Sequence, residues 1–424
     1  MTDPARAPTA APMPGEAGAG GRLSLLVLLI AVTCLSQFYR VSNGVIAPEL
    51  TAELGLGPQQ LAWAGGAFFV TLLALQIPVG IWFDRYGGRV TVSALSLVAV
   101  VGAVLIARAD SATSLIVARA VVGIGCAASF MCVVFLCSRW FPKDRLTTVL
   151  SWVFAASNIG TLAAGTPLAW AAARIGWRNG FLAVGAVTLA VAALFFLLVR
   201  DRPPGMPAPP RARDRRESFT GFVEVLRTRG LWSVLALHTF AYATMLTVLG
   251  IWAGPYLHDV HGLGAVARGN VMTLMGTAQI VGILCYGPMD RFVRSRKRIA
   301  IAGALLTVAA LLALASLRQP PLWLAVALLV LFTFLAAYPI QIVAQGRALF
   351  PDRLAGRGVT TVNMAQLVGM VLLSVTSGAI VAAFAPVEGL APEWAYRAVF
   401  LSLAGGLVLG LVFYRRSPDD VAAR

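Results

Sequence analysis

The stretch that decides the fold is Gly80–Val90, GIWFDRYGGRV, which ends one long apolar run and precedes another. It places Asp84, Arg85 and Arg89 within six residues. Unpaired charge is expensive in hydrocarbon, so a short charged turn between two apolar segments of membrane length is expected to lie in water. The turn therefore predicts two membrane-spanning helices that meet at a membrane surface.

A weaker copy of this turn, YGPMDRFVRSR, occurs at Tyr286–Arg296. Asp290 and Arg291 align there with Asp84 and Arg85 of the first copy, while Tyr286 replaces a glycine. Two copies about half a chain apart predict two related halves. A generic basic turn is the alternative, and the repeat argues against it.

Composition places the chain in a membrane. Hydrophobic residues make up 58% of the sequence and charged residues only 12%, whereas soluble domains carry about 25% charged residues. The net charge of +16 could suggest nucleic acid binding, but the charges lie in short loops between apolar runs, so no nucleic-acid partner is expected. The five cysteines have no metal-ligand spacing, and no phosphate-binding G-x-x-x-x-G-K-[ST] motif occurs. We therefore predict no cofactor, no metal and no direct drive by ATP.

Twelve apolar runs are long enough to cross a bilayer as helices. We therefore predict an all-α polytopic membrane protein. The runs lie near residues 23–47, 59–80, 90–108, 113–137, 147–172, 179–199, 231–255, 269–288, 299–317, 321–345, 358–385 and 395–414.

The basic residues predict the orientation of these spans. If both chain ends lie inside, the inner loops and tails hold 26 Lys and Arg residues and the outer loops hold six. This bias predicts cytoplasmic N- and C-termini in a bacterial inner membrane. The predicted units are a disordered tail at 1–21, a six-helix bundle at 22–199, a cytoplasmic linker at 200–230, a second bundle at 231–415 and a tail at 416–424.

The linker ends in an apolar pattern. Phe219, Phe222, Val223 and Leu226 have the spacing of one helix face. The segment either lies on the inner membrane surface or simply leads into the seventh span.

Two arginines, Arg40 and Arg119, fall inside predicted spans, whereas all eighteen acidic residues fall in loops, in tails or at span ends. Each mid-span arginine costs about 2.5–3.5 kcal/mol on the insertion scale, which favours a function in a water-filled cavity that attracts anions. The alternative for Arg40 is a side chain that snorkels to the outer surface. The alternative for Arg119 is a donor to backbone carbonyls of neighbouring helices.

Several of these motifs resemble one family. The form G-x-x-x-D-R-x-G-x-R resembles the loop between helices 2 and 3 of the major facilitator superfamily of transporters. Phe38-Tyr39-Arg40 followed by Ser42 and Pro48 resembles the first span of its anion:cation symporter branch, whose span-1 arginine binds the anion. Arg119-x-x-x-Gly123-x-Gly125 resembles the span-4 motif of the superfamily. The chain departs from the branch at Cys126, where a glutamate is frequent, so a coupling carboxylate is missing.

The resemblance implies a monomeric secondary transporter with two pseudo-symmetric six-helix bundles, which imports a small organic anion with protons. Arg40 would bind the anion and Arg119 would assist. In the superfamily the loop 2–3 aspartate caps the inner start of helix 11 and pairs with a basic residue that ends helix 4. The implied gating residues are Asp84, Arg85, Arg89, Arg139, Asp290 and Arg291, with Asp84 near Gly358–Thr361 and near Arg139.

His238 is the only histidine inside a predicted span, so it is the candidate for proton coupling; a hydrogen-bonded packing residue is the alternative. Uncharged residues that could hydrogen-bond a polar substrate, or simply join helices, are Tyr39, Asn158, Tyr242, Tyr338, Gln341 and Asn363.

Two other functions stay open. A partial motif at Gly160, Gly165 and Pro167 favours a proton-coupled drug or metabolite efflux antiporter. A membrane sensor or scaffold that does not transport is the other class. No catalytic constellation appears in the loops, so an enzyme is not expected.

Overall fold

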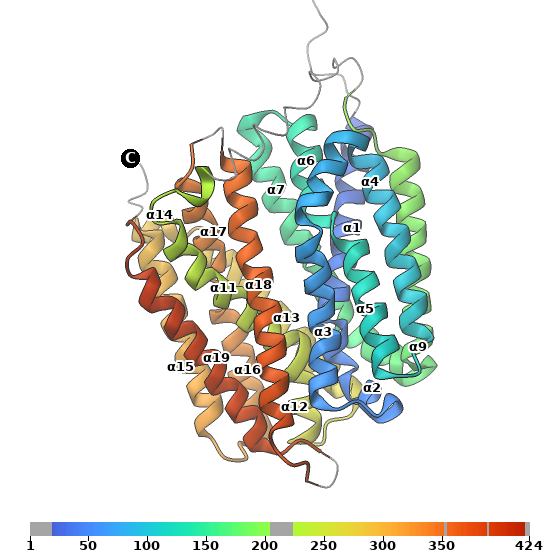
Figure 1. Ribbon diagram of the computed structural model, residues 1–424, viewed down its shortest axis with the longest axis vertical. Coiled ribbons are helices and arrows are strands. Elements are labelled where there is room, and N and C mark those ends of the chain that lie inside the picture. Colours follow the sequence, from blue (N-terminus) through green and yellow to red (C-terminus); the bar gives the residue numbers. More distant parts are fainter. Residues whose placement is uncertain (1–18, 204–223, 352–353, 388–389, 420–424) are drawn as a thin grey trace, which may run out of the picture.

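The computed structural model describes residues 19–203, 224–351, 354–387 and 390–419. Nearly all of this part of the chain is helical, the helices run along the long axis of the molecule (Figure 1), and no β-strand longer than a single bridge occurs in it. Ten helical stretches are long and apolar enough to cross a membrane. These features confirm the predicted all-α polytopic membrane fold.

Two glycine turns and one shorter helix account for the difference between ten stretches and the twelve predicted spans. The long helix α4 (Gln76–Ala107) is broken at Gly87, whose φ of 81° and ψ of 172° are outside the helical region. Together with α3 (Pro58–Ala74), the part before Gly87 forms the second span, and the part after it forms the third. Helix α9 (Thr166–Leu198) is broken in the same way at Gly176, with φ 79°. Only glycine adopts such angles readily, so these two residues allow the chain to turn.

The first bundle contains the six N-terminal spans. Three of them are interrupted: the second at Leu75, the fourth at Ala127–Ala128 and the fifth at Asn158 and Gly165. Besides α3, α4 and α9, its helices are α1 (Ala19–Val45), α2 (Ala47–Leu54), α5 (Ala112–Cys126), α6 (Ser129–Trp140), α7 (Lys143–Ser157) and α8 (Ile159–Ala164).

The second bundle contains the six C-terminal spans, and the first of these includes a π-helical turn, η1 (Val248–Trp252). The other elements are α11 (Leu231–Thr247), α12 (Ala253–Asp259), α13 (Ala265–Tyr286), α14 (Met289–Val293), α15 (Arg296–Ser316), α16 (Leu322–Leu335), α17 (Pro339–Ala348), α18 (Ala355–Ala382) and α19 (Glu393–Tyr414). Most of the predicted apolar face at 219–226 lies outside the described residues.

The molecule has two distinct ends. The start of α1, the end of α9, the start of α11 and the end of α19 lie at one end, which we call the terminal end (Figure 1). Helices α2 and α12 lie at the opposite end, the far end (Figure 1). The bundles contact one another through α3 and α18, through α9 and α13, and through α1 and η1.

Close contacts between the bundles concentrate towards the far end. A Cβ atom on Gly254 of α12 would lie 1.9 Å from the carbonyl oxygen of Gly44 in α1. A Cβ atom on Gly378, in the last part of α18, would lie 2.4 Å from the side chain of Ala62 near the start of α3. Helices α3 and α18 separate towards the terminal end (Figure 1). The bundles are therefore sealed against one another at the far end.

Candidate functional site

Arg40 lies in α1 where the first bundle meets the second. A Cβ atom on Gly250 of η1 would lie 3.2 Å from the Arg40 carbonyl oxygen, so the two backbones are in direct contact. A π-helical turn inside an α-helical span frequently marks a functional site. The first and seventh spans thus bring Arg40 to the junction of the two bundles.

Arg40 and Asn43 share a face of α1, because residues three positions apart on a helix are neighbours. Arg40 is half-buried, and Asn43 is 2% exposed. The Arg40 Nε atom and both amide atoms of Asn43 are buried and have no hydrogen-bond partner among the described residues. A buried polar atom without a partner costs about 1–3 kcal/mol, so a polar ligand that pairs with this face gains free energy. Asn43 was not among the residues predicted from the sequence.

Arg119 is buried in α5 and holds three spans together. Its Nη1 donates to the carbonyl oxygen of Tyr39 at 2.8 Å, and its Nε donates to that of Ala64 at 3.3 Å. The guanidinium carbon lies 5.3 Å from the ring centre of Phe68. This is the geometry of the predicted alternative, a donor to backbone carbonyls. The Nη2 atom is buried and has no partner in the described part of the chain, so a contact with substrate remains a prediction.

No carboxylate of the described residues pairs with either of these two arginines. The ion pairs found among the described residues involve other side chains, and none of them includes Arg40 or Arg119. The junction of the bundles is therefore electropositive.

Three predicted binding residues use their polar atoms inside their own bundle. The Tyr39 hydroxyl hydrogen-bonds with Thr188 Oγ1 at 3.1 Å, and Asn158 Nδ2 donates to the carbonyl oxygen of Phe154 at 2.9 Å. Gln341 Nε2 donates to the carbonyl oxygen of Tyr286. The Tyr39 and Gln341 contacts join helices, whereas the Asn158 contact lies within its own span. Gln341 Oε1 is buried and has no partner among the described residues.

Of the other predicted polar residues, Tyr338 and Asn363 each have a polar atom without a partner among the described residues. Tyr338 is fully buried, its hydroxyl has no partner among the described residues, and its ring packs edge-on against Tyr286. Asn363 is half-buried, with an Nδ2 atom that likewise lacks a partner there. Tyr242 is half-buried in α11. A direct contact between these residues and Arg40 is not observed, and their contact with substrate stays a prediction.

His238 is fully buried in α11, and both of its ring nitrogens lack a hydrogen-bond partner among the residues that the structure describes. The hydrogen bond expected for the alternative, a packing residue, is not found among the described residues. A buried histidine without partners is free to exchange a proton once water or a ligand reaches it.

At the terminal end, the predicted turn is held by a residue that the sequence analysis missed. Asp201, just after α9, accepts a hydrogen bond from the backbone N–H of Arg89 at 2.8 Å. A Cβ atom on Gly87 would lie 2.0 Å from the same carboxylate. The Arg89 guanidinium also lies over the ring of Phe196 at 4.5 Å. Arg89 and Asp201 thus fasten the turn to the sixth span of the same bundle.

The remaining predicted gating residues whose side chains are described form no ion pair across the bundles in this conformation. Asp84 and Arg85 are exposed, and Asp84 acts electrostatically on Arg139 of its own bundle. No hydrogen bond or ion pair joins Asp84 to α18 among the described residues, so the contact that the family resemblance implies is not observed in this conformation. Asp290 pairs with Arg296 at 3.3 Å, while the side chain of Arg291 lies outside the described residues.

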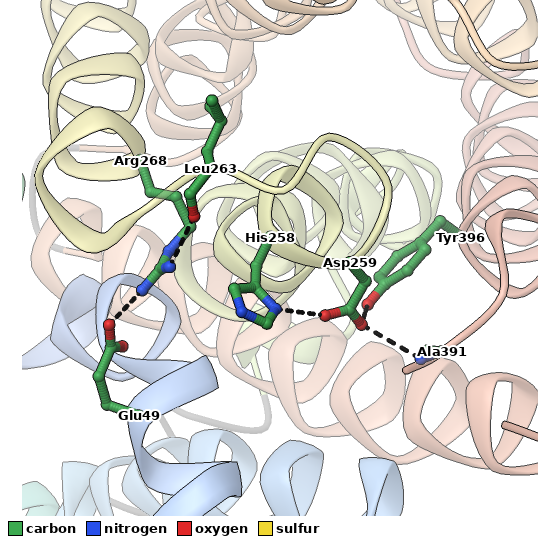
Figure 2. A network of polar contacts seen from close by, with 7 residues as sticks. All are labelled: Glu49, His258, Asp259, Leu263, Arg268, Ala391 and Tyr396. Carbon is green, nitrogen blue, oxygen red and sulfur yellow. Dashed lines mark hydrogen bonds and ion pairs between the residues drawn. The ribbon is translucent and has the colours of Figure 1, made fainter. Parts of the chain in front are cut away.

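The far end carries two polar networks (Figure 2). In the first, Arg268 Nη2 of α13 lies 2.5 Å from Glu49 Oε1 of α2, and Arg268 Nη1 donates to the Leu263 carbonyl oxygen at 2.9 Å. In the second, the Asp259 carboxylate is 2.8 Å from His258 Nδ1 and accepts a hydrogen bond from the Tyr396 hydroxyl at 2.5 Å. The first network joins the two bundles, and the second stays within the C-terminal bundle.

A groove between α1, α8 and α9 is a separate feature. Phe38, Pro167 and Val184 are among its apolar lining residues, and none of its lining residues is charged. It is therefore unsuited to bind an anion.

Comparison with known proteins identifies the family to which this architecture belongs. The sequence profile described as Major Facilitator Superfamily matches residues 28–269, more than half of the chain. The chain belongs to the major facilitator superfamily. This membership confirms the predicted fold of two six-helix bundles and makes the chain an integral membrane transporter.

Relatives of this superfamily member include proteins named as anion transporters. One from Cupriavidus necator, named as a sulfoacetate transporter, is 28% identical over 305 residues, which cover 68% of this chain and 70% of the relative. One from Agrobacterium vitis, named as a tartrate transporter, is 24% identical over 344 residues, which cover 76% of each protein. A solved structure of a bacterial homologue of the human lysosomal transporter Spinster superposes with a TM-score of 0.79 at 20% identity, covering 94% of this chain and 97% of that one.

Proposed function

We propose that this transporter carries a small organic anion, such as a mono- or dicarboxylate, by alternating access. The observation that carries the proposal is the guanidinium of Arg40 at the junction of the bundles, with no ion-pair partner among the described residues and with the unpaired amide of Asn43 on the same helix face. The relatives named for sulfoacetate and tartrate support an anionic substrate.

The chemistry of the two side chains suits a carboxylate. The planar guanidinium of Arg40 can donate two parallel hydrogen bonds to the two oxygens of one carboxylate. The amide of Asn43 can donate another hydrogen bond and accept one from a substrate hydroxyl. A hydrogen bond to a charged group contributes about 1.5–3 kcal/mol, more than a neutral one.

The proposed direction is import, with protons as the coupling ion, by a monomer in the bacterial inner membrane. The excess of basic residues in the loops and tails of the terminal end supports a cytoplasmic location for that end. The far end would then be the outer side, and the conformation sealed at the far end would be the inward-facing one. His238 is the proposed proton site, because it is a buried histidine in a span and neither ring nitrogen has a hydrogen-bond partner among the described residues.

Binding of anions to the purified protein tests the proposal. We expect carboxylates and sulfonates, and not cations, to raise the thermal unfolding temperature. Arg40→Ala should abolish this shift, since a loss of about 3 kcal/mol weakens affinity by more than about a hundredfold. Arg40→Lys should weaken binding less, because lysine keeps the positive charge and loses only the two parallel N–H donors of the guanidinium.

The matched control is Tyr39→Phe, which changes the neighbouring residue and removes only a hydroxyl that is bonded to Thr188. It should bind as the wild type does. If Arg40→Ala binds anions with unchanged affinity, Arg40 is not the anion-binding residue. If the best ligands are cations, the anion proposal fails and the proton-coupled drug or metabolite efflux alternative replaces it.

A further inference from the structure

We propose that Glu49 and Arg268 form the outer gate, an ion pair that holds the far end shut and breaks in every transport cycle. Glu49 is in the first turn of α2, directly after the first span, and Arg268 is in the first turn of α13, which forms the eighth span. The two residues belong to different bundles, so the far end cannot open unless they separate. The inference concerns any substrate that the transporter carries.

Burial and a second hydrogen bond fix the position of the Arg268 guanidinium in this pair. Arg268 is only 2% exposed, and its Nη1 donates to the carbonyl oxygen of Leu263 at 2.9 Å, which holds the guanidinium towards α2. Nη2 then meets Glu49 Oε1 at 2.5 Å (Figure 2). The N-terminus of α2 also favours the carboxylate of Glu49.

The pair is the one ion pair in the described part of the chain that joins the bundles. Glu53 pairs with Arg178 inside the N-terminal bundle, and His258–Asp259 and Asp290–Arg296 are local pairs in the C-terminal bundle. Charge therefore acts between the two halves at this single described place.

The pair is also incompletely satisfied. Arg268 Nε and Glu49 Oε2 are buried and have no hydrogen-bond partner among the described residues. Both atoms regain partners in water once the far end opens, so the interaction is reversible. If one partner loses its charge, the other is left buried and unpaired, and this favours the open state.

Further contacts near the ion pair pack α13 tightly against the N-terminal bundle. On the next turns of α13, the Thr273 hydroxyl lies 2.9 Å from that of Thr166 in α9, and a Cβ atom on Gly269 would lie 2.5 Å from the side chain of Ala169. The first turns of α13 thus carry both the ion pair and the packing that close the far end.

The experiment compares two glutamates of the same short helix. Glu49→Gln keeps the shape of the side chain and removes the charge that pairs across the bundles. Glu53→Gln, one turn further along α2, removes a charge that binds Arg178 and the Trp177 indole N–H in its own bundle. Spin labels at Arg108→Cys and Arg318→Cys, in a background in which the native cysteines are replaced, report the distance between the bundles at the far end by double electron–electron resonance.

We expect Glu49→Gln to increase the population with a long distance at least about tenfold, and Glu53→Gln to leave the distribution unchanged. Arg268→Gln should act as Glu49→Gln does, and the exchange Glu49→Arg with Arg268→Glu should restore most of the closed population. A wild-type distribution in Glu49→Gln would overturn the proposal, and so would an equal shift in Glu53→Gln. The measurement uses no substrate, so the two proposals are tested independently. A negative result here does not affect the anion proposal, and rejection of the anion proposal does not affect the proposed gate.

Discussion

We expect the side chain of Asn43 to lower the stability of the ligand-free protein and to strengthen anion binding. Replacing it with an apolar residue should therefore raise stability and weaken binding. Its side chain is 2% exposed, and both amide atoms are unpaired among the described residues, so the ligand-free protein bears a cost of about 1–3 kcal/mol for each. Asn43→Leu has a similar shape and no polar atoms. We expect it to raise the unfolding temperature of the ligand-free protein and to weaken anion binding about tenfold. Thermal unfolding with and without ligand measures both, and unchanged affinity would remove Asn43 from the site.

His238 predicts a separation of coupling from binding. We expect His238→Gln to weaken uptake driven by a proton gradient and to leave exchange of substrate across the membrane largely intact. The matched control is His261→Gln, which changes a half-buried histidine in the turn between α12 and α13. Uptake and exchange in proteoliposomes at several pH values measure the effect. If uptake by His238→Gln keeps its full pH dependence, a proton carried by the substrate itself is the better explanation.

At the residue scale, the sequence predicts which side chains lie in the membrane but not what they face. The lack of carboxylates inside the spans was sufficient to single out Arg40 and Arg119. The carbonyl groups that Arg119 contacts come from Tyr39 and Ala64 on two other spans, and hydrophobic periodicity does not give the rotation of one span against another. Glu49 and Arg268 lie 219 positions apart, and no sequence pattern connects them.

At the scale of the helices, the sequence predicts the spans and misses their interruptions. All twelve apolar runs correspond to helical spans, because burial in lipid requires each backbone to satisfy its own hydrogen bonds. The π-turn at Val248–Trp252, which contacts α1, was not predicted, because the apolar pattern of the span does not mark it. Arg268 was expected in an outer loop, but α13 already begins at Ala265 and buries it.

The crossing of α1 and α12 predicts an effect of a single methyl group. A Cβ atom on Gly254 would lie 1.9 Å from the Gly44 carbonyl oxygen, which is backbone and cannot move aside cheaply. We expect Gly254→Ala to shift the protein towards the state that is open at the far end. Gly405→Ala in α19 is the control, since a Cβ atom there meets nothing within 4 Å. The spin-label distance at the far end tests this, and equal distributions for Gly254→Ala and wild type would contradict it.

At the scale of the whole molecule, the two ends differ in how the bundles are held. The far end has an ion pair and close glycine contacts between bundles, whereas at the terminal end the contacts Arg89–Asp201 and Asp290–Arg296 lie within single bundles. Asp84 is exposed, and no hydrogen bond joins it to α18 among the described residues. We therefore propose that the contacts implied for Asp84 by the family resemblance form in the opposite conformation, in which the terminal end is shut.

This division predicts opposite effects for charge removal at the two ends. Asp84→Asn should leave the conformation described here intact and destabilise the opposite one, by about 0.3–1 kcal/mol if Asp84 caps α18 there. Glu49→Gln should do the reverse. Because the two sites lie at opposite ends and share no partner, their free-energy effects should add, so the double variant should return towards the wild-type distribution. Spin-label distances at the far end, measured for the wild type, both single variants and the double variant, test whether the two effects add. If Asp84→Asn opens the far end as Glu49→Gln does, the two residues do not hold opposite gates, and alternating access in this transporter depends on other contacts.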